Sequence, residues 1–262
     1  MEIRLDGKNA LVCGASQGIG LAIARKLAEA GASLLILARN EANLKIAINS
    51  FPQNANQNHS YLVADFNEPI KVIENIKKIL LSGKTFHILV NNSGGPTPGI
   101  LYQDSIDKLY TAFTSHIIMS HLLMQNLLDN MKNQKWGRII NVISIGAKQP
   151  IENLGTSNTI RGAMMSWSKT LARELAPFGI TVNNILPGLT ETSRLASLYH
   201  NIAESSGRSY EDILAEKIKE IPVGRLASPD ELANLALFIA SDFANYINGV
   251  SIAVDGGLLK CF

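Results

Sequence analysis

The first residues with a definite chemistry form a glycine-rich turn between positions 14 and 20, with the sequence GASQGIG. An apolar run precedes this turn, and a helical pattern follows it directly. Glycines here allow a tight turn and let backbone amides approach a pyrophosphate at the positive end of the helix. The strand–turn–helix context is the one that a dinucleotide site requires. The residues expected to contact the cofactor here are Gly14, Ser16, Gln17, Gly18, Ile19 and Gly20.

Arg39 is the next candidate, because it follows the predicted strand Ser33–Ala38 at once. In an NAD site an acidic residue at this place accepts a hydrogen bond from the ribose 2′-hydroxyl, but here Ala38 occupies it. A guanidinium suits the 2′-phosphate dianion, so the sequence favours NADP(H) over NAD(H). The alternative is a solvated surface arginine. A second basic residue inside the glycine turn is absent, since Ser16 and Gln17 stand there.

These residues need a scaffold, and short apolar runs alternate with helical patterns along the whole chain. Continuous apolar runs indicate strands that are buried on both faces, and the alternation predicts an α/β fold, a doubly wound parallel sheet of the Rossmann type. The expected strands are Ala10–Cys13, Ser33–Ala38, Tyr61–Ala64, His87–Asn91, Arg138–Ile143, Thr181–Ile185 and Val250–Val254. The expected helices are Ile19–Ala30, Glu41–Asn49, Glu68–Leu81, Ser105–Met131, Ser157–Ala176 and Asp230–Ala240.

One segment departs from this rhythm. Between residues 190 and 229 polar helical pieces replace the strands. A long excursion after a strand end is where a doubly wound enzyme places a substrate lid, although a surface helical hairpin would look the same. We therefore expect a single domain over residues 1–262 with a helical lid at 190–229.

The motifs together resemble the short-chain dehydrogenase/reductase family over nearly the whole chain. The spacing GxxxGxG is joined by Asn91-Asn92-Ser93-Gly94 at a strand end and by Val254-Asp255-Gly256-Gly257 near the C-terminus. The resemblance implies that Asp65 and Phe66 border the adenine, that Asn91 borders the adenosine ribose, and that Thr192 lies on the pyrophosphate or carboxamide side of the nicotinamide. The further cofactor contacts that it implies are Ser93, Gly94, Pro187, Gly188 and Thr190.

The catalytic positions of that family are mostly changed in this sequence. The family uses a Ser, a Tyr and a Lys in a YxxxK helix, and an Asn on the preceding helix. Ser144 occupies the serine position, but the YxxxK motif reads Ser157-Asn-Thr-Ile-Arg161, and His116 stands at the asparagine position. This pattern resembles a divergent branch of the β-ketoacyl-acyl-carrier-protein reductases.

Each replacement has a chemical consequence. A serine hydroxyl is a far weaker acid than a phenol, whose unperturbed pKa is about 10. Arg161 can bond the ribose or a phosphate, but a guanidinium does not relay protons. His116 carries an imidazole, with an unperturbed pKa near 6.5, so we expect it to supply the proton, aided by Ser144. A packed or solvent-facing histidine is the alternative.

Composition limits the other possibilities. The 262 residues carry 24 Lys plus Arg and 22 Asp plus Glu, so the formal charge of +2 argues against a nucleic-acid or membrane-surface partner. No run approaches the roughly 18 apolar residues of a membrane span, and the histidines lack metal-ligand spacing. Two cysteines suggest a reducing compartment, so a cytoplasmic protein is expected. The family resemblance implies a homodimer or homotetramer.

The sequence thus predicts an NADP(H)-dependent oxidoreductase that reduces a carbonyl in a small molecule or a 3-oxoacyl thioester, with an atypical catalytic site. Positioning donor and acceptor can by itself supply much of a rate enhancement, so the loss of the phenol does not exclude turnover. A second interpretation is an inert nucleotide-binding sensor or scaffold, which the intact glycine turn beside a lost YxxxK supports. A lyase or epimerase that never needed the phenol is a third.

Overall fold

The computed structural model describes residues 2–54 and 56–261 and contains one parallel β-sheet. Its strands are β1 Asn9–Cys13, β2 Ser33–Ala38, β3 Ser60–Val63, β4 Ile88–Asn91, β5 Gly137–Val142, β6 Ile180–Pro187 and β7 Ser251–Val254. Their order is β3-β2-β1-β4-β5-β6-β7, and every pairing is parallel. The order reverses between β1 and β4, which is where doubly wound sheets bind their ligands. The predicted fold class is confirmed.

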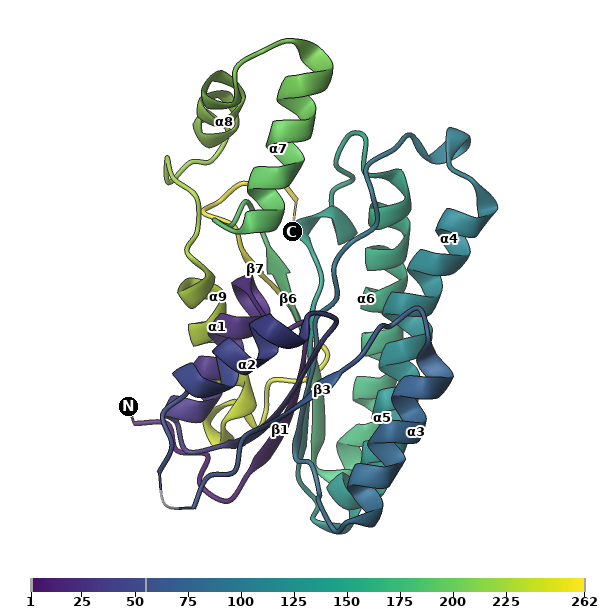
Figure 1. Cartoon of the computed structure of the whole chain (residues 1–262), viewed down its shortest axis with the longest axis vertical. Coiled ribbons are helices and arrows are strands. Elements are labelled where there is room, and N and C mark those ends of the chain that lie inside the picture. The colour runs from purple at the N-terminus through teal and green to yellow at the C-terminus, as the bar shows by residue number, and fades with distance from the viewer. Residues whose placement is uncertain (1, 55, 262) are drawn as a thin grey trace.

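Helices cover both faces of the sheet, as Figure 1 shows with the sheet between two helical layers. One layer consists of α1 Gly18–Glu29, α2 Glu41–Ser50 and α9 Pro229–Ala240. The other consists of α3 Pro69–Leu81, α4 Ile106–Phe113, α5 Met119–Asn133 and α6 Gly155–Leu175. Short 3-10 turns occur at Leu101–Gln103, Ile145–Ala147, Ala176–Phe178 and Asp242–Ala244.

The apolar strands are buried on both sides, which explains why their sequences do not alternate in polarity. In β1, Ala10 and Val12 enter the core beneath α1 and α9, whereas Leu11 and Cys13 enter the core beneath α3 and α5. All four side chains are fully buried. Burial on both faces is the usual state of a parallel strand between two helical layers.

The helix predicted over Ser105–Met131 is present, but it is not regular along its whole length. The chain there is helical from Ile106 to Asn133, but a π-helical turn, η2 (Thr114–Ile118), separates α4 from α5. A π-turn adds a residue to one helical turn and is frequent at functional sites. This turn carries His116, and periodicity could not reveal it because its flanks are regular helix.

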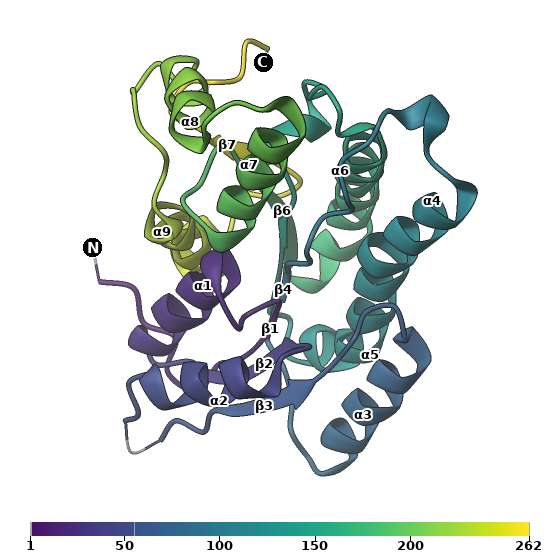
Figure 2. The same ribbon diagram turned by 45° about the horizontal axis from the view of Figure 1, so that its top comes forward.

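Within residues 190–229 the chain forms two helices, α7 (Ser193–Ser206) and α8 (Tyr210–Lys219), which pack against each other. Figure 2 shows this pair above the sheet, beside the ends of β6 and β7. Thr192 begins α7, since its hydroxyl accepts a hydrogen bond from the Leu195 amide at 3.2 Å. No helix in the described parts of the chain is long and apolar enough to cross a bilayer.

Candidate active site

The glycine turn leaves room only for glycine at two places. Gly14 has φ +59°, and a Cβ there would lie 2.5 Å from the Asn92 carbonyl oxygen. A Cβ at Gly20 would clash with the Gly14 carbonyl oxygen and lie 2.6 Å from the side-chain nitrogen Nδ2 of Asn92. Asn92 Nδ2 in turn donates to the carbonyls of Cys13 and Gly14 at 3.3 and 3.2 Å. The loop after β4 therefore holds the turn in a shape that leaves the first N–H groups of α1 open to an anion.

Arg39 and Asp65 line a common cavity of about 210 Å³ at the ends of β2 and β3. Arg39 is exposed there, and Asp65 Oδ1 accepts a hydrogen bond from the Asn67 amide at 3.0 Å. Lys71 from the first turn of α3 lines the same cavity and pairs with Glu68 at 3.0 Å. Lys71 is a second cation beside Arg39 that the sequence did not predict, because it comes from α3 and not from the glycine turn.

Phe66 and Asn91, which follow or end strands β3 and β4 and were predicted to contact the cofactor, also contact other parts of the protein. Phe66 packs against the apolar core beneath α3 and α5. The Asn91 side chain is 6% exposed and donates to Asn141 Oδ1 at 2.8 Å. Asn141 donates onward to Asn184 Oδ1 at 3.1 Å, so a polar row links β4, β5 and β6. The Asn91 amide is thus already used in the sheet, and its contact with a ribose stays a prediction.

The segment after β6 lies beside the glycine turn. Thr192 Cγ2 would be 3.3 Å from a Cβ placed on Gly18, which brings the start of α7 against the start of α1. Thr190 is buried and donates to the Gly188 carbonyl at 3.2 Å. Pro187 ends β6, and the two segments predicted to contact the cofactor are adjacent in space.

Ser144 lies at the end of β5 and is partly exposed. Its Oγ accepts a hydrogen bond from the Gly146 amide at 3.0 Å, which fixes the side chain and leaves its O–H free to donate elsewhere. Asn158 on α6 secures the following loop through two hydrogen bonds with Ile151, at 3.2 and 2.8 Å. Ser157 is one helical turn before Arg161, so both residues lie on one face of α6.

Arg161 is 7% exposed, and its Nη1 donates to the Val142 carbonyl at 3.1 Å. Burial, and then the neighbouring Arg194, lower the pKa of Arg161 to about 10. The guanidinium is still charged at neutral pH. It therefore places a positive charge beside the end of β5, where the family has a lysine.

His116 is 3% exposed, and its Nδ1 lies 2.5 Å from Ser93 Oγ. Burial lowers the pKa of His116 well below 6.5, and the positive charges of Arg161 and Arg194 lower it further. The imidazole is thus neutral at neutral pH. Ser93 thus hydrogen-bonds this histidine, its contact with the cofactor stays a prediction, and the Gly94 that follows is exposed.

Arg194 is the residue of this site that the sequence analysis missed. It lies in the first turn of α7, and its Nη2 donates to the Pro96 carbonyl at 3.3 Å, across the loop after β4. Burial of the guanidinium lowers its pKa, although the side chain as a whole is exposed. A cation in the first turn opposes the helix dipole, and that unfavourable placement was the available signal.

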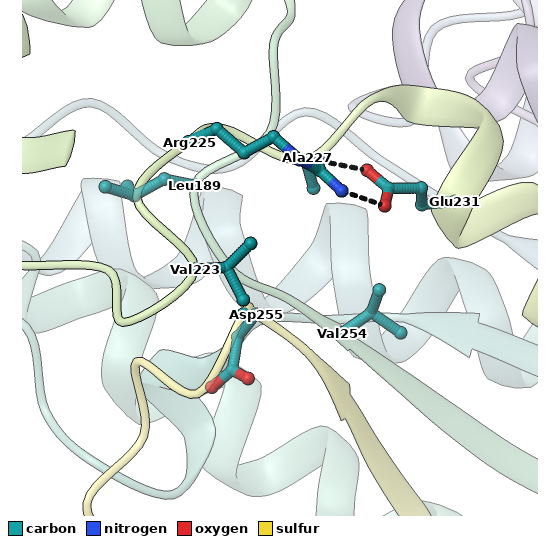
Figure 3. A pocket seen from close by; sticks show the side chains of 8 residues that line it. Leu189, Val223, Arg225, Ala227, Glu231, Val254 and Asp255 are labelled. Carbon is teal, nitrogen blue, oxygen red and sulfur yellow. Dashed lines mark hydrogen bonds and ion pairs between the residues drawn. The ribbon is translucent and has the colours of Figure 1, made fainter.

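A separate cavity of about 100 Å³ lies at the ends of β6 and β7 (Figure 3). Arg225 crosses it to make two bonds of 2.8 Å with Glu231, which also accepts from the Ser228 amide at 2.8 Å. In Figure 3 Asp255 points away from this pair. The ion pair secures the N-terminus of α9, and none of the predicted catalytic residues lines the cavity.

Within residues 2–54 and 56–261, no group of three or more His, Cys, Asp or Glu side chains is placed to hold a metal ion. The candidate site consists of hydroxyls, guanidiniums and one imidazole beside a backbone cradle.

Comparison with known proteins identifies the family. A family model described as enoyl-(acyl carrier protein) reductase matches residues 14–259. The 3-oxoacyl-(acyl-carrier-protein) reductase FabG of Aquifex aeolicus is 35% identical, over 98% of this chain and 100% of its own. The L-sorbose reductase of Gluconobacter frateurii has a TM-score of 0.93 at 32% identity, with both chains fully covered. The chain belongs to the short-chain dehydrogenase/reductase family, as its motifs indicated.

The relatives also bear on the cofactor. The sorbose reductase was solved with NADPH and L-sorbose. The NADPH-dependent reductase BacG of Bacillus subtilis is 32% identical over 98% of this chain and 99% of its own. The prediction of NADP(H) as the cofactor is thus confirmed by relatives that bind or depend on NADPH.

Proposed function

We propose that this protein is an NADP(H)-dependent oxidoreductase that reduces a carbonyl group. The observation that carries the proposal is that Ser144 and Arg161 lie at the same carboxyl-terminal edge of the parallel sheet as an intact dinucleotide cradle. The glycine turn, Arg39 and the start of α7 fit NADP(H), because they offer backbone N–H groups and a cation for its phosphates. When bound, NADPH supplies a hydride to the carbonyl carbon, and the reduction takes up one further proton.

The side chains of the chain divide the remaining work. Ser144 donates its O–H to the carbonyl oxygen, while Gly146 holds its Oγ from the other side. Arg161 stabilises negative charge that develops on that oxygen and bonds the nicotinamide ribose. These two groups replace the electrostatic contribution of the missing phenol and lysine.

His116 moves the proton in this proposal. With Nδ1 accepting from the Ser93 hydroxyl, the neutral imidazole carries its proton on Nε2, from which it donates to the reduced oxygen. Nδ1 then takes up the proton of the Ser93 hydroxyl, and water returns a proton to Ser93 Oγ. The imidazole gains one proton as it loses another, so it stays neutral throughout. Because the ring does not need to be charged, the lowered pKa of His116 is compatible with this role.

The substrate is a small ketone or a 3-oxoacyl thioester. The relatives include a 3-oxoacyl reductase and a ketose reductase, which share the reduction of a carbonyl. A sensor or scaffold that binds nucleotide without turnover is the competing function, favoured by the serine at position 157.

One experiment separates the two functions. NADPH binding is measured by fluorescence titration, and its oxidation is followed by absorbance with ketoses, simple ketones and acetoacetyl thioesters. Turnover that falls in the His116→Asn and Ser144→Ala proteins supports the reductase. Tight NADPH binding without turnover on any carbonyl would contradict it.

The double variant Ser157→Tyr/Arg161→Lys sharpens the result. If the wild-type protein is a reductase, this variant changes the rate of a reaction that already occurs. Activity that arises only in the double variant would mean that the native site is inert.

A further inference from the structure

Two arginines from distant parts of the chain meet over one glycine. A Cβ placed on Gly95 would lie 2.8 Å from Arg194 Nη2 and 3.6 Å from Arg161 Nη2. Arg161 comes from α6 and Arg194 from the first turn of α7. The absence of a side chain at position 95 is what allows both guanidinium groups to occupy this space.

The two positive charges lack a compensating negative charge. In the described part of the chain, no Asp or Glu carboxylate pairs with either arginine, and each has a backbone carbonyl as its protein acceptor. The two charges instead act on each other and on His116, since Arg194 lowers the pKa of Arg161 and both lower that of His116. Like charges held close together, one of them buried, are unfavourable unless an anion joins them.

Buried nitrogens without a hydrogen-bond partner also indicate a ligand site near the two arginines. Among the described residues, four buried side-chain nitrogens have no hydrogen-bond partner; His59 Nδ1 and Arg138 Nε lie elsewhere, but Arg161 Nε and His116 Nε2 belong to this site. Buried polar atoms are nearly always paired, so such exceptions call for a ligand or a functional reason. Arg161 is 7% exposed and His116 3%, whereas Arg194 is exposed and so reachable from solvent.

We propose that Arg194 and Arg161 bind a carboxylate of the substrate, so that the natural substrate is an oxo acid. The inference rests on the proposed carbonyl reduction and adds its substrate class. A guanidinium fork matches a carboxylate through two parallel hydrogen bonds, and the exposed Arg194 makes this contact while buried Arg161 adds charge. The phosphates of the cofactor have their own cradle at Gly14–Gly20, and the proposed mechanism gives Arg194 no role, which leaves this arginine for another anion.

The kinetic test compares acetoacetate with its neutral methyl ester. We expect kcat/KM for the acid to exceed that for the ester by about 10- to 100-fold, the usual value of a hydrogen bond to a charged group. Arg194→Met removes this preference without changing the Kd for NADPH, and Arg194→Lys restores part of it. Arg208→Met is the matched control, since Arg208 lies in the turn between α7 and α8 and pairs with Glu216 of α8 at 2.6 Å, and it leaves the preference unchanged.

A binding test does not depend on turnover. Malonate, which is not reduced, is added to the protein with NADP+, and the melting temperature is recorded. We expect malonate to raise it in the wild type and in Arg208→Met, but not in Arg194→Met.

The outcomes keep the two proposals apart. Equal rates with acid and ester, or an acid preference that survives Arg194→Met, overturn the carboxylate site while carbonyl reduction stands. A higher Kd for NADPH in Arg194→Met with an unchanged acid preference overturns it too, because the arginine then serves the cofactor. If no carbonyl is reduced, the proposed function fails, and the malonate shift alone decides: its presence supports an anion site and its absence overturns it.

Discussion

The cofactor side of this molecule is built from backbone, whereas its reaction side is built from side chains. At the start of α1, close contacts between Gly14, Gly20 and Asn92 define the shape, and backbone amides are the groups proposed to bind the cofactor. At the end of β5 and on α6, the proposed chemistry depends on Ser144, Arg161 and their neighbours. Backbone recognition tolerates few changes, because almost any Cβ would fill the cradle. Side-chain chemistry can be replaced residue by residue while the fold persists.

The two sides also differ in charge balance. Near Arg39 the cation Lys71 has an acidic neighbour in Glu68, and both of these side chains are exposed. Around Gly95, Arg161 and Arg194 each have a backbone carbonyl as acceptor, and no carboxylate of the described residues pairs with either. Part of the charge in the first region is thus balanced within the protein, whereas the second region lacks a compensating negative charge, which is a feature expected of a binding site.

The largest effect should come from the cradle. Gly20→Ala places a Cβ against the Gly14 carbonyl, so we expect about a 100-fold or greater loss of NADPH affinity and a loss of about 1–3 kcal/mol in stability. Fluorescence titration and urea denaturation measure the two quantities. Gly162→Ala on α6 is the control, because a Cβ there meets no described atom within 4 Å, and it should stabilise the helix by up to about 1 kcal/mol. Normal NADPH affinity in Gly20→Ala would contradict the backbone account.

On the reaction side, Ser144→Ala should lower kcat by about 10²- to 10³-fold, as expected for the loss of one donor to a developing oxyanion. The Kd for NADPH should not change, because the cradle is separate. Stopped assays at saturating NADPH and a titration of the same preparation test both statements. Ser144→Thr, which keeps a hydroxyl, should recover part of the rate. A parallel loss of NADPH binding would show that the two sides are not independent.

Arg39→Met should weaken NADPH binding by about 10- to 100-fold and leave NADH binding unchanged, since only NADPH carries the 2′-phosphate. Lys71→Met should have a smaller effect, because its ammonium is already paired with Glu68. Titration of both nucleotides with both variants gives the comparison. Equal losses for NADH and NADPH would mean that Arg39 does not recognise the phosphate.

The smallest effect concerns pH. The pKa of His116 is lowered on folding, so below pH 6.5 the unfolded chain takes up a proton that the native protein does not. Stability is therefore complete above pH 6.5 and falls as the pH drops towards the native pKa. His116→Asn should show a smaller loss of unfolding free energy between pH 7 and pH 5.5 in urea denaturation. His87, whose pKa is also lowered by burial, is present in both proteins, so the difference reports His116. Identical pH dependence in the two proteins would refute the neutral imidazole.

Sequence patterns predicted local features well and side-chain neighbours poorly. The strand Ser33–Ala38 has the predicted bounds, and α1 begins one residue before the predicted start. Both follow from local periodicity and from the glycine turn. The π-turn at Thr114–Ile118 was missed because it depends on how α4 and α5 pack against the rest of the molecule. Arg194 was missed because the residues near it come from three separate segments.

The sequence by itself determined the fold class and predicted where the dinucleotide binds, because both follow from hydrophobic periodicity and from glycine spacing along the chain. It also showed that the tyrosine and lysine of the family are replaced by Ser157 and Arg161. Only the tertiary structure decided that His116 is buried and neutral, since that depends on burial and on charges from α6 and α7. The meeting of Arg161 and Arg194 over Gly95 was likewise decided in three dimensions, because segments far apart in the chain become neighbours only when the sheet is assembled.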